Sequence, residues 1–327
     1  MQQILAVVPE GLRNQVIREH ALKHLFGFEY LIAPYTIAHL KISQFLLEQG
    51  FEMRLKDRLQ IYLTNTLEPI EPLKNYLLPA LTEEVGLAQK IKDTPILVIT
   101  GNPPYSGHSL NRGQWITDLI EDYKIVDGKP LAERNSKWLQ DDYVKFIRFA
   151  QWKMDRVTEG IVGIITNHSF LDNPTFRGMR QSLTKTFNQI DLHGNSKKKE
   201  QSPDGNRDEN VFDIAQGVCI SIFVRKQDLK QTVFHADLWG KREDKYRTCA
   251  EDTLNVIKWK RTVPSSPYYL FTSQNKKLRA QYDSGYKVTD IFDVNVLGFQ
   301  THRDDFAIAL DRRTIERRAK DLIDEAN

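Results

Sequence analysis

The chain has 327 residues, a hydrophobic fraction of 40% and a net charge of +3, so it can bury a sizeable core in one large domain or two smaller ones. That charge is too small to indicate nucleic-acid binding by itself, and any basic surface must be local. Cys219 and Cys249 are the only cysteines, which excludes a disulfide framework and a zinc site with four cysteine ligands. We predict no metal site, and scarce cysteine suits a cytoplasmic protein. No run approaches the roughly 18 apolar residues of a membrane span, and no secretory leader pattern is visible.

Two patterns alternate along the first two thirds of the chain. Apolar residues at helical spacing predict helices over 16–25, 33–49, 141–157 and 173–187. Short apolar runs predict strands over 59–69, 96–100, 161–166, 189–194 and 218–226. This alternation predicts an α/β fold with a mostly parallel sheet, in which 96–100 is a buried central strand. The alternation fades after about residue 230, so we predict a first part over 1–228 and a second over 229–327.

The predicted strand at 96–100 leads into Asn102-Pro103-Pro104-Tyr105. Ligands of open α/β sheets bind at the carboxyl ends of strands, where this tetrapeptide lies. The side-chain oxygen of Asn102 and the carbonyl oxygen of Pro103 can accept the two hydrogens of an amino group on a planar ring, which frees the nitrogen lone pair for attack. The prolines fix that carbonyl, and Tyr105 can stack on the ring, so the rate gain comes from orientation and preorganised dipoles. The alternative is a Pro-Pro turn with Tyr105 in the core.

The tetrapeptide resembles the catalytic Asp/Asn/Ser-Pro-Pro-aromatic motif of the amino-methylating DNA methyltransferases, which use S-adenosylmethionine. Other stretches resemble, in the same order, the large single-chain restriction-modification enzymes of this kind. They are FGFEYLIAPYTIAHLKI (26–42), IYLTNTLEP (61–69), ITNHSFLDNPTFRGMRQSL (165–183), VFDIAQGVCISIFVRK (211–226) and GFQTHRDDFAIALDR (298–312). The resemblance implies a Rossmann-like methyltransferase sheet, N-terminally incomplete, over 1–228, and a linker with the beginning of a target-recognition region over 229–327. It also implies methyl transfer to the N6 amine of adenine in double-stranded DNA.

The resemblance assigns cofactor contacts to five residues. Glu29 takes the place of an acid that accepts hydrogen bonds from the ribose hydroxyls, and a carboxylate suits a diol. Asn65, with Thr66 beside it, takes the place of a polar residue at the adenine amino group, where many relatives have Asp. Phe146 takes the place of an aromatic that packs on that adenine, and Asn102 is shared with the catalytic motif. The alternatives are a surface acid for Glu29 and plain helix core for Phe146.

A target adenine must leave the duplex to reach a buried cofactor, at a cost of a few kcal/mol. By resemblance, Phe212 stacks on the flipped base opposite Tyr105, and each such contact contributes about 1–3 kcal/mol. The basic residues of the preceding loop are interpreted as phosphate contacts: Lys197, Lys198, Lys199 and Arg207. The alternatives are core packing for Phe212 and a solvated surface for the loop.

The family also has a glycine-rich loop that holds the methionine part of the cofactor, upstream of the strand with the ribose-binding acid. Only Gly11 precedes Gly27 in this chain, and the segment LAVVPEGLRNQ does not fit that loop. We therefore expect upstream and downstream parts of a larger polypeptide. Three functions stay open: an adenine-N6 DNA methyltransferase, a protein-glutamine or RNA N-methyltransferase, and an inactive DNA-binding remnant.

Overall fold

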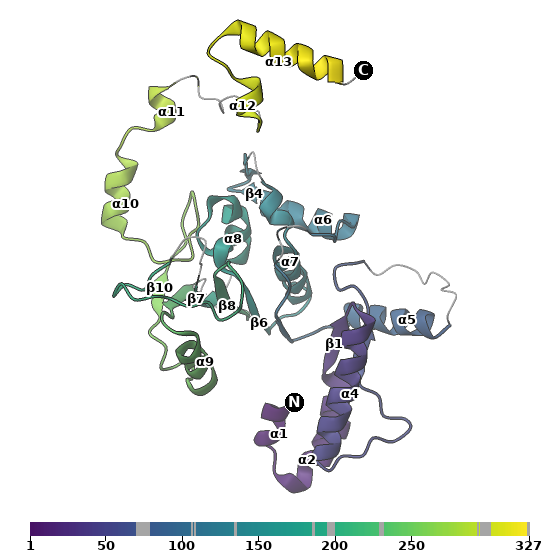
Figure 1. The fold of residues 1–327 in the computed structure, drawn as a ribbon. Coiled ribbons are helices and arrows are strands. Elements are labelled where there is room, and N and C mark those ends of the chain that lie inside the picture. Colours follow the sequence, from purple (N-terminus) through teal and green to yellow (C-terminus); the bar gives the residue numbers. More distant parts are fainter. Residues whose placement is uncertain are drawn as a thin grey trace. The chain divides into compact units, whose positions relative to one another are not determined.

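The computed structural model describes residues 1–69, 79–105, 107, 109–133, 136–184, 187–194, 200–228, 232–292, 294 and 302–325 (Figure 1). The chain divides into two compact units, Met1–Ser273 and Gln274–Asn327. The helices of the first unit are α1 (Gln2–Ala6), α2 (Arg13–Val16), α3 (Leu22–His24), α4 (Ile32–Glu48), α5 (Pro79–Asp93), α6 (Gln114–Glu121), α7 (Asp142–Met154), α8 (Arg177–Leu183) and α9 (Arg242–Glu251). Its strands are β1 (Phe26–Glu29), β2 (Gln60–Leu63), β3 (Val98–Gly101), β4 (Ile125–Val126), β5 (Lys129–Pro130), β6 (Gly160–Asn167), β7 (Phe187–His193), β8 (Val218–Arg225), β9 (Val233–Asp237) and β10 (Lys260–Thr262).

A six-stranded sheet with the order β10-β9-β7-β8-β6-β3 forms the centre of the first unit. β3 runs parallel to β6, and β7 runs parallel to β9. β8 lies between β6 and β7 and is antiparallel to both, and β10 is antiparallel to β9. The predicted α/β fold is confirmed. The sheet, predicted to be mostly parallel, is mixed. Because β3, β6, β7 and β9 share one direction, their carboxyl ends lie at the same edge.

β1 and β2 form a separate parallel pair, with Glu29 opposite Leu63. The prediction of a buried central strand at 96–100 is wrong for these residues. A strand does form there, but within the described part of the chain β3 pairs on one side with β6 and leaves Leu97 and Val98 56% and 66% exposed. An apolar run therefore signals a strand here without revealing how many neighbours that strand has.

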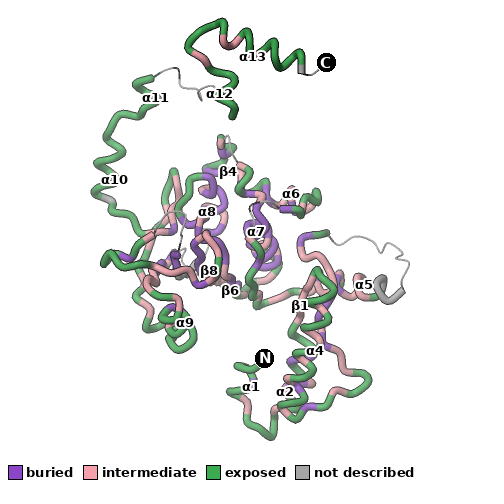
Figure 2. The backbone as a smooth tube through the Cα atoms, in the orientation of Figure 1, coloured by how far each residue is buried: buried purple, intermediate pink, exposed green. Residues whose placement is uncertain are grey.

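The main core lies between the sheet and the helices α7 and α8, where buried residues concentrate (Figure 2). Its largest members include Tyr123, Tyr143 and Phe170, all fully or almost fully buried. α8 is preceded by a short 3-10 turn whose cap, Asn173, accepts a hydrogen bond from the backbone of Thr175, as the Asn-Pro signal predicts.

The first compact unit continues beyond the boundary expected near residue 228. β9 and β10 extend the sheet, and the buried guanidinium of Arg180 donates to the carbonyl oxygens of Phe170 at 2.7 Å and Tyr268 at 2.6 Å. Such long-range bonds explain why the irregular sequence after 228 still folds onto the sheet, since buried donors require partners.

The second unit contains α10 (Lys276–Asp283), α11 (Val288–Ile291), α12 (Asp304–Ala307) and α13 (Arg312–Glu325), and most of its described residues are exposed. The charged C-terminal pattern forms α13, whose Arg318 donates to the carbonyls of Phe306 and Ile308. Among the residues that the structure describes, no helix has the length and apolar character needed to cross a bilayer.

Candidate functional site

The carboxyl edge of the sheet gathers residues from distant parts of the sequence. Asn102 directly follows β3, His168 directly follows β6, and β7 and β9 end at His193 and Asp237. β8 runs the other way and begins at this edge, because Val218 lies opposite His193. The predicted tetrapeptide thus stands at the edge where α/β sheets bind ligands.

The four residues of the tetrapeptide differ in exposure. Asn102 and Pro104 are exposed, Pro103 is buried, and Tyr105 is half-buried. The ring of Tyr105 packs against the main core and against a second apolar cluster of Leu192, Val211 and Val218, which we call the edge cluster. Burial, with a smaller contribution from Cys219, raises the pKa of Tyr105 to about 12, so its hydroxyl stays protonated at neutral pH.

The loop after the tetrapeptide is tied to the start of α7. The backbone N–H of Gly107 donates to Asp141 at 3.1 Å. Asp142 accepts hydrogen bonds from the hydroxyl of Ser109 at 2.6 Å and from the amide of Asn111 at 2.9 Å. The carboxylates at the start of α7 therefore hold the chain that follows the tetrapeptide, and this fixes the tetrapeptide from its C-terminal side.

Three of the predicted cofactor residues lie at one edge of the β1–β2 pair. Glu29 ends β1, and its carboxylate accepts hydrogen bonds from the backbone N–H groups of Tyr30 at 2.8 Å and Leu31 at 2.9 Å. Asn65 lies in the turn after β2, two residues beyond the partner of Glu29. Thr66 is half-buried in the same turn. The parallel register therefore brings Glu29 and the turn of Asn65 to the same end of the strand pair.

The side chain of Asn65 also connects the two halves of the site. Its Oδ1 accepts from the backbone of Leu67 at 3.0 Å, and its Nδ2 donates to Oδ1 of Asn111 at 2.8 Å. The ammonium of Lys92 donates to the carbonyl oxygens of Asn65 at 2.6 Å and Glu68 at 3.1 Å. Burial lowers the pKa of Lys92 to about 8. This turn is therefore held in place from α5 and from the loop after the tetrapeptide.

Phe146 of α7 lies in a third apolar cluster, which is centred on the buried side chains of Leu67, Ile116 and Phe149. Phe146 is half-buried there, and Phe28 of β1 packs against the same cluster. The structure thus brings Phe146 to the turn that carries Asn65. Its position is compatible with both expectations for this residue, namely core packing and a surface for a planar ring.

Phe212 lies in the loop before β8 and is half-buried against the edge cluster, the same cluster that Tyr105 contacts. Asn210 shapes this loop. Its Nδ2 donates to the carbonyl oxygens of Gly194 at 3.0 Å, Ile214 at 3.1 Å and Gln216 at 2.6 Å, and its Oδ1 accepts from the backbone of Phe212 at 2.9 Å. One side chain therefore fastens the loop to the end of β7 and holds the backbone at Phe212.

The close approach of these segments requires a glycine at 194. Its φ is +80°, and a Cβ there would lie 2.5 Å from the Cα atom of Asn210. Both the left-handed backbone and the lack of space exclude a larger residue.

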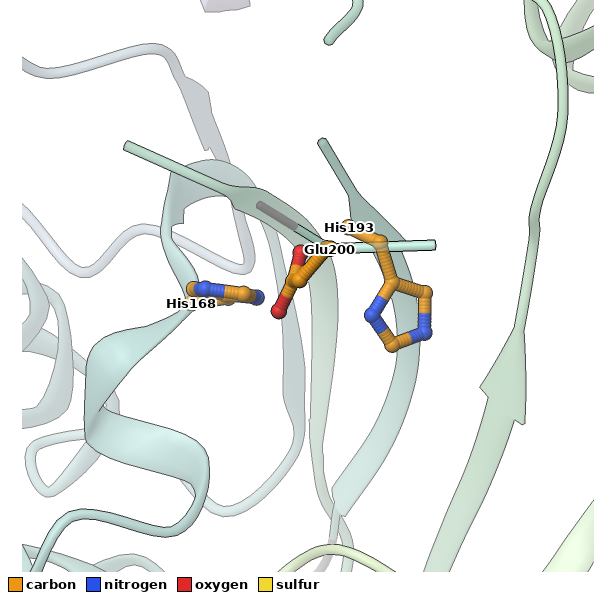
Figure 3. A group of neighbouring side chains, drawn as sticks. All are labelled: His168, His193 and Glu200. Atoms are coloured by element: carbon orange, nitrogen blue, oxygen red, sulfur yellow. The ribbon is translucent and has the colours of Figure 1, made fainter. Parts of the chain in front are cut away.

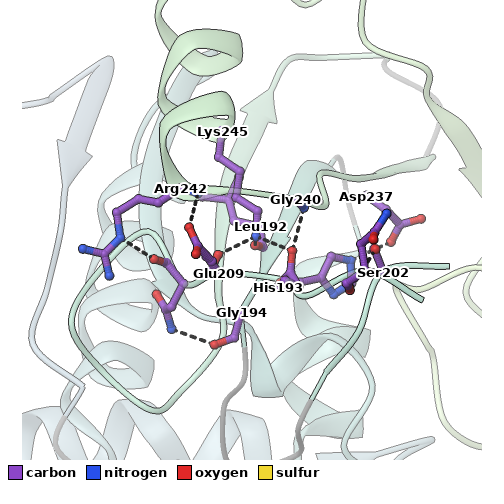
Figure 4. Close-up of polar contacts among 12 residues, drawn as sticks. Leu192, His193, Gly194, Ser202, Glu209, Asp237, Gly240, Arg242 and Lys245 are labelled. Atoms are coloured by element: carbon purple, nitrogen blue, oxygen red, sulfur yellow. Dashed lines mark hydrogen bonds and ion pairs between the residues drawn. The ribbon is translucent and has the colours of Figure 1, made fainter. Parts of the chain in front are cut away.

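Helix α9 anchors the loop from the other side (Figure 4). Arg242 donates from Nε to the carbonyl of Asn210 at 2.7 Å. The buried ammonium of Lys245 donates to the carbonyls of Leu192 at 2.6 Å and Glu209 at 2.8 Å and pairs with Asp208 at 2.8 Å. The side chains of this ion pair are both fully buried. Removing one partner of such a pair is strongly destabilising, because it leaves an uncompensated buried charge.

Only part of the predicted phosphate-contacting set can be placed. Arg207 is exposed, and its backbone forms an isolated antiparallel β-bridge with Gln201 in the loop that leads to Phe212. Lys197, Lys198 and Lys199 lie outside the described residues. Sequence reasoning missed three residues that organise the site: Asn111, Asn210 and Lys245.

No protein-family model matches the chain, and no curated protein matches its sequence significantly. Its fold is similar to that of solved structures, among them three with 21% identity to this chain. A DrdV–DNA complex has a TM-score of 0.74 over 98% of this chain and 33% of its own. The ATP-dependent Type ISP restriction-modification enzyme LlaBIII, bound to DNA, has a TM-score of 0.70 over 99% of this chain and 23% of its own. A nuclease-deletion mutant of the Type ISP restriction-modification enzyme LlaGI, in complex with a DNA substrate mimic, has a TM-score of 0.73. The match covers 97% of this chain and 26% of the LlaGI chain. The chain therefore has the fold of one region of these proteins and spans at most a third of their length.

Proposed function

We propose that this chain is the central part of an S-adenosylmethionine-dependent methyltransferase that modifies the N6 amine of adenine in double-stranded DNA, within a restriction-modification protein. One observation carries the proposal. Asn102-Pro103-Pro104-Tyr105 follows β3 at the carboxyl edge of the sheet, and Tyr105 and Phe212 pack against the same edge cluster. The tetrapeptide and the second aromatic, which are over a hundred residues apart in sequence, thus share one place in the fold.

The proposed substrate is a purine flipped out of the duplex. The side-chain oxygen of Asn102 and the carbonyl oxygen of Pro103 accept hydrogen bonds from the two N6–H groups, and the nitrogen lone pair is then directed at the methyl donor. Tyr105 and Phe212 hold the two faces of the base. At about 1–3 kcal/mol for each contact, the two rings together offset the few kcal/mol that base flipping costs. Because Tyr105 keeps its proton, it presents a neutral ring to the base.

The residues for the adenosine part of the cofactor form a coherent set. Glu29 offers a carboxylate to the ribose hydroxyls, the turn of Asn65 and Thr66 offers polar atoms to the adenine, and Phe146 offers a ring beside that turn. S-adenosylmethionine, when bound, supplies the methyl group from its sulfonium. The chain's own residues hold and orient the two reactants, and none of them needs to form a covalent intermediate.

An upstream segment is part of the proposal. We infer that it supplies the glycine-rich loop for the methionine part of the cofactor and a strand that pairs with β3. Two observations support this inference: within the described residues β3 pairs with a strand on one side only, and the chain covers 23–33% of the three similar structures.

Methyl transfer tests the proposal directly. The chain, alone and joined to the polypeptide encoded upstream of Met1, is incubated with methyl-labelled S-adenosylmethionine and with either duplex DNA or a protein extract. We expect label in DNA from the extended protein, and cofactor binding by the short chain at least about tenfold weaker. Label in protein would favour the glutamine-modifying alternative, and no transfer by the extended protein would favour the inactive remnant.

A further inference from the structure

A cavity of about 240 Å³ opens at the carboxyl ends of β6, β7 and β9. Its polar lining includes three imidazoles, three carboxylates and one ammonium, contributed by His168, His193, His235, Asp172, Glu200, Asp237 and Lys260. None of these residues belongs to the tetrapeptide or to the proposed cofactor set. These polar groups therefore form a cluster at the carboxyl edge of the sheet that is separate from the proposed methyl-transfer site.

Three of the lining side chains converge as metal ligands do (Figure 3). One nitrogen of His168, one of His193 and one carboxylate oxygen of Glu200 all lie within 4.8 Å of one another. The two imidazole rings are nearly perpendicular, with centroids 6.3 Å apart. Ligand atoms at about 2.0–2.2 Å from a zinc ion lie roughly 4 Å or less from each other. Side-chain rotations that move the donor atoms by about 1 Å would therefore bring the three donors to bonding distance.

The ring of His193 is held in a fixed orientation. Its Nε2 lies 3.1 Å from the carboxylate of Asp237, and Figure 3 shows the other ring nitrogen turned toward Glu200. Trp239 stacks on the ring of His193, with ring centroids 3.4 Å apart and planes 10° apart. Lys260 bonds to the second oxygen of Asp237 at 2.9 Å. A carboxylate behind an imidazole is the usual second layer of a histidine metal site, because it fixes the tautomer and the ring direction.

The ring of His168 packs directly against the backbone at Gly217. A Cβ at Gly217 would lie 2.4–2.9 Å from three atoms of that ring, so only glycine leaves room for it. The backbone N–H of His168 donates to the carbonyl of Gly217 at 3.0 Å. Both imidazoles are buried, at 6% and 8% exposure. Preorganised ligands of this kind lower the cost of assembling a metal site.

We propose that His168, His193 and Glu200 bind one divalent transition-metal ion of the Zn²⁺ or Fe²⁺ class, with Asp237 as a positioning residue for His193. Two imidazoles and one carboxylate are a ligand set that these ions accept, and three protein ligands leave a coordination position that faces the cavity. This metal site is independent of the proposed methyl transfer, because other residues form it and metal binding by itself tests it.

Zinc binding by the full chain tests the proposal. After treatment with a chelator and its removal, the protein is titrated with Zn²⁺ by calorimetry, and Co²⁺ is added to a second sample as a visible-light probe. We expect one ion per chain and a Co²⁺ absorption band. Glu200→Gln and His193→Ala should each weaken Zn²⁺ binding at least about tenfold, and Asp237→Asn should weaken it about 10–100-fold.

His302→Ala is the matched control, since His302 is exposed and lies in the second compact unit. It should leave the binding unchanged. Glu200→Gln keeps the size of the side chain, so it serves as the decisive variant if His193→Ala does not fold. No Zn²⁺ binding by the parent chain, or binding that Glu200→Gln leaves unchanged, overturns the proposal.

Discussion

Replacing Asn210 with alanine removes the side chain that fastens the Phe212 loop. Its two N–H groups are shared among the carbonyls of Gly194, Ile214 and Gln216, and its oxygen accepts from the backbone of Phe212, which amounts to about three hydrogen bonds. Each contributes roughly 0.5–1.5 kcal/mol, so Asn210→Ala should lower the free energy of unfolding by about 2–4 kcal/mol. The backbone groups left behind are partly buried, which favours the upper half of that range.

Urea unfolding, followed by tryptophan fluorescence and by circular dichroism, measures this loss. With a slope of about 2–3 kcal/mol per molar urea, the midpoint should fall by roughly 1 M. Asn206→Ala is the matched control, because Asn206 lies in an exposed turn of the same loop. A loss below about 0.5 kcal/mol for Asn210→Ala, or an equal loss for both variants, would refute the anchoring role.

Three further predictions concern the surroundings of the site. Tyr105→Phe keeps the ring that packs on both clusters and should change the free energy of unfolding by less than about 1 kcal/mol. Tyr105→Ala removes the ring and should lower the free energy of unfolding by about 2 kcal/mol or more. Equal losses for the two variants in urea unfolding would contradict the packing role. Gly217→Ala should lower the unfolding free energy by about 1–3 kcal/mol, because its Cβ would meet the ring of His168 at 2.4 Å, and an unchanged urea midpoint would show that the ring can move away. The pKa of Lys92 is about 8 in the folded chain and near 10.4 when unfolded, so between pH 8 and 10 the unfolded chain binds more protons and stability rises with pH. The midpoint of thermal unfolding should therefore rise over that window and rise less in Lys92→Met; an identical rise in both proteins would contradict the assignment.

Local patterns in the sequence predicted the elements around the site well. Asp141 and Asn173 precede α7 and the turn into α8, and the apolar run of β6 forms a strand as expected. These signals act over a few residues, so they survive in a single sequence. The end of β3 could likewise be placed, and with it the position of Asn102.

Long-range polar contacts left no comparable signal. No sequence pattern predicts burial for Asp208 or Lys245, yet their side chains form a fully buried pair that holds the loop of Phe212. Burial of charge depends on partners far away in sequence, which neither periodicity nor composition encodes. For the same reason the role of α9, within the stretch interpreted as a linker, could not be predicted.

The central claim is that Asn102 and its neighbours hold an adenine amine for methylation. The most direct measurement is the amount of labelled N6-methyladenine, determined by mass spectrometry of digested duplex DNA after incubation with the extended protein and labelled S-adenosylmethionine. The parent protein should produce it. Asn102→Ala should reduce the yield by at least about a hundredfold and the cofactor affinity by far less, because four other residues of the proposed set also contact the cofactor, and Asn255→Ala, at an exposed position, should match the parent. Near-parent amounts of N6-methyladenine from Asn102→Ala, or label on another base, would contradict the account.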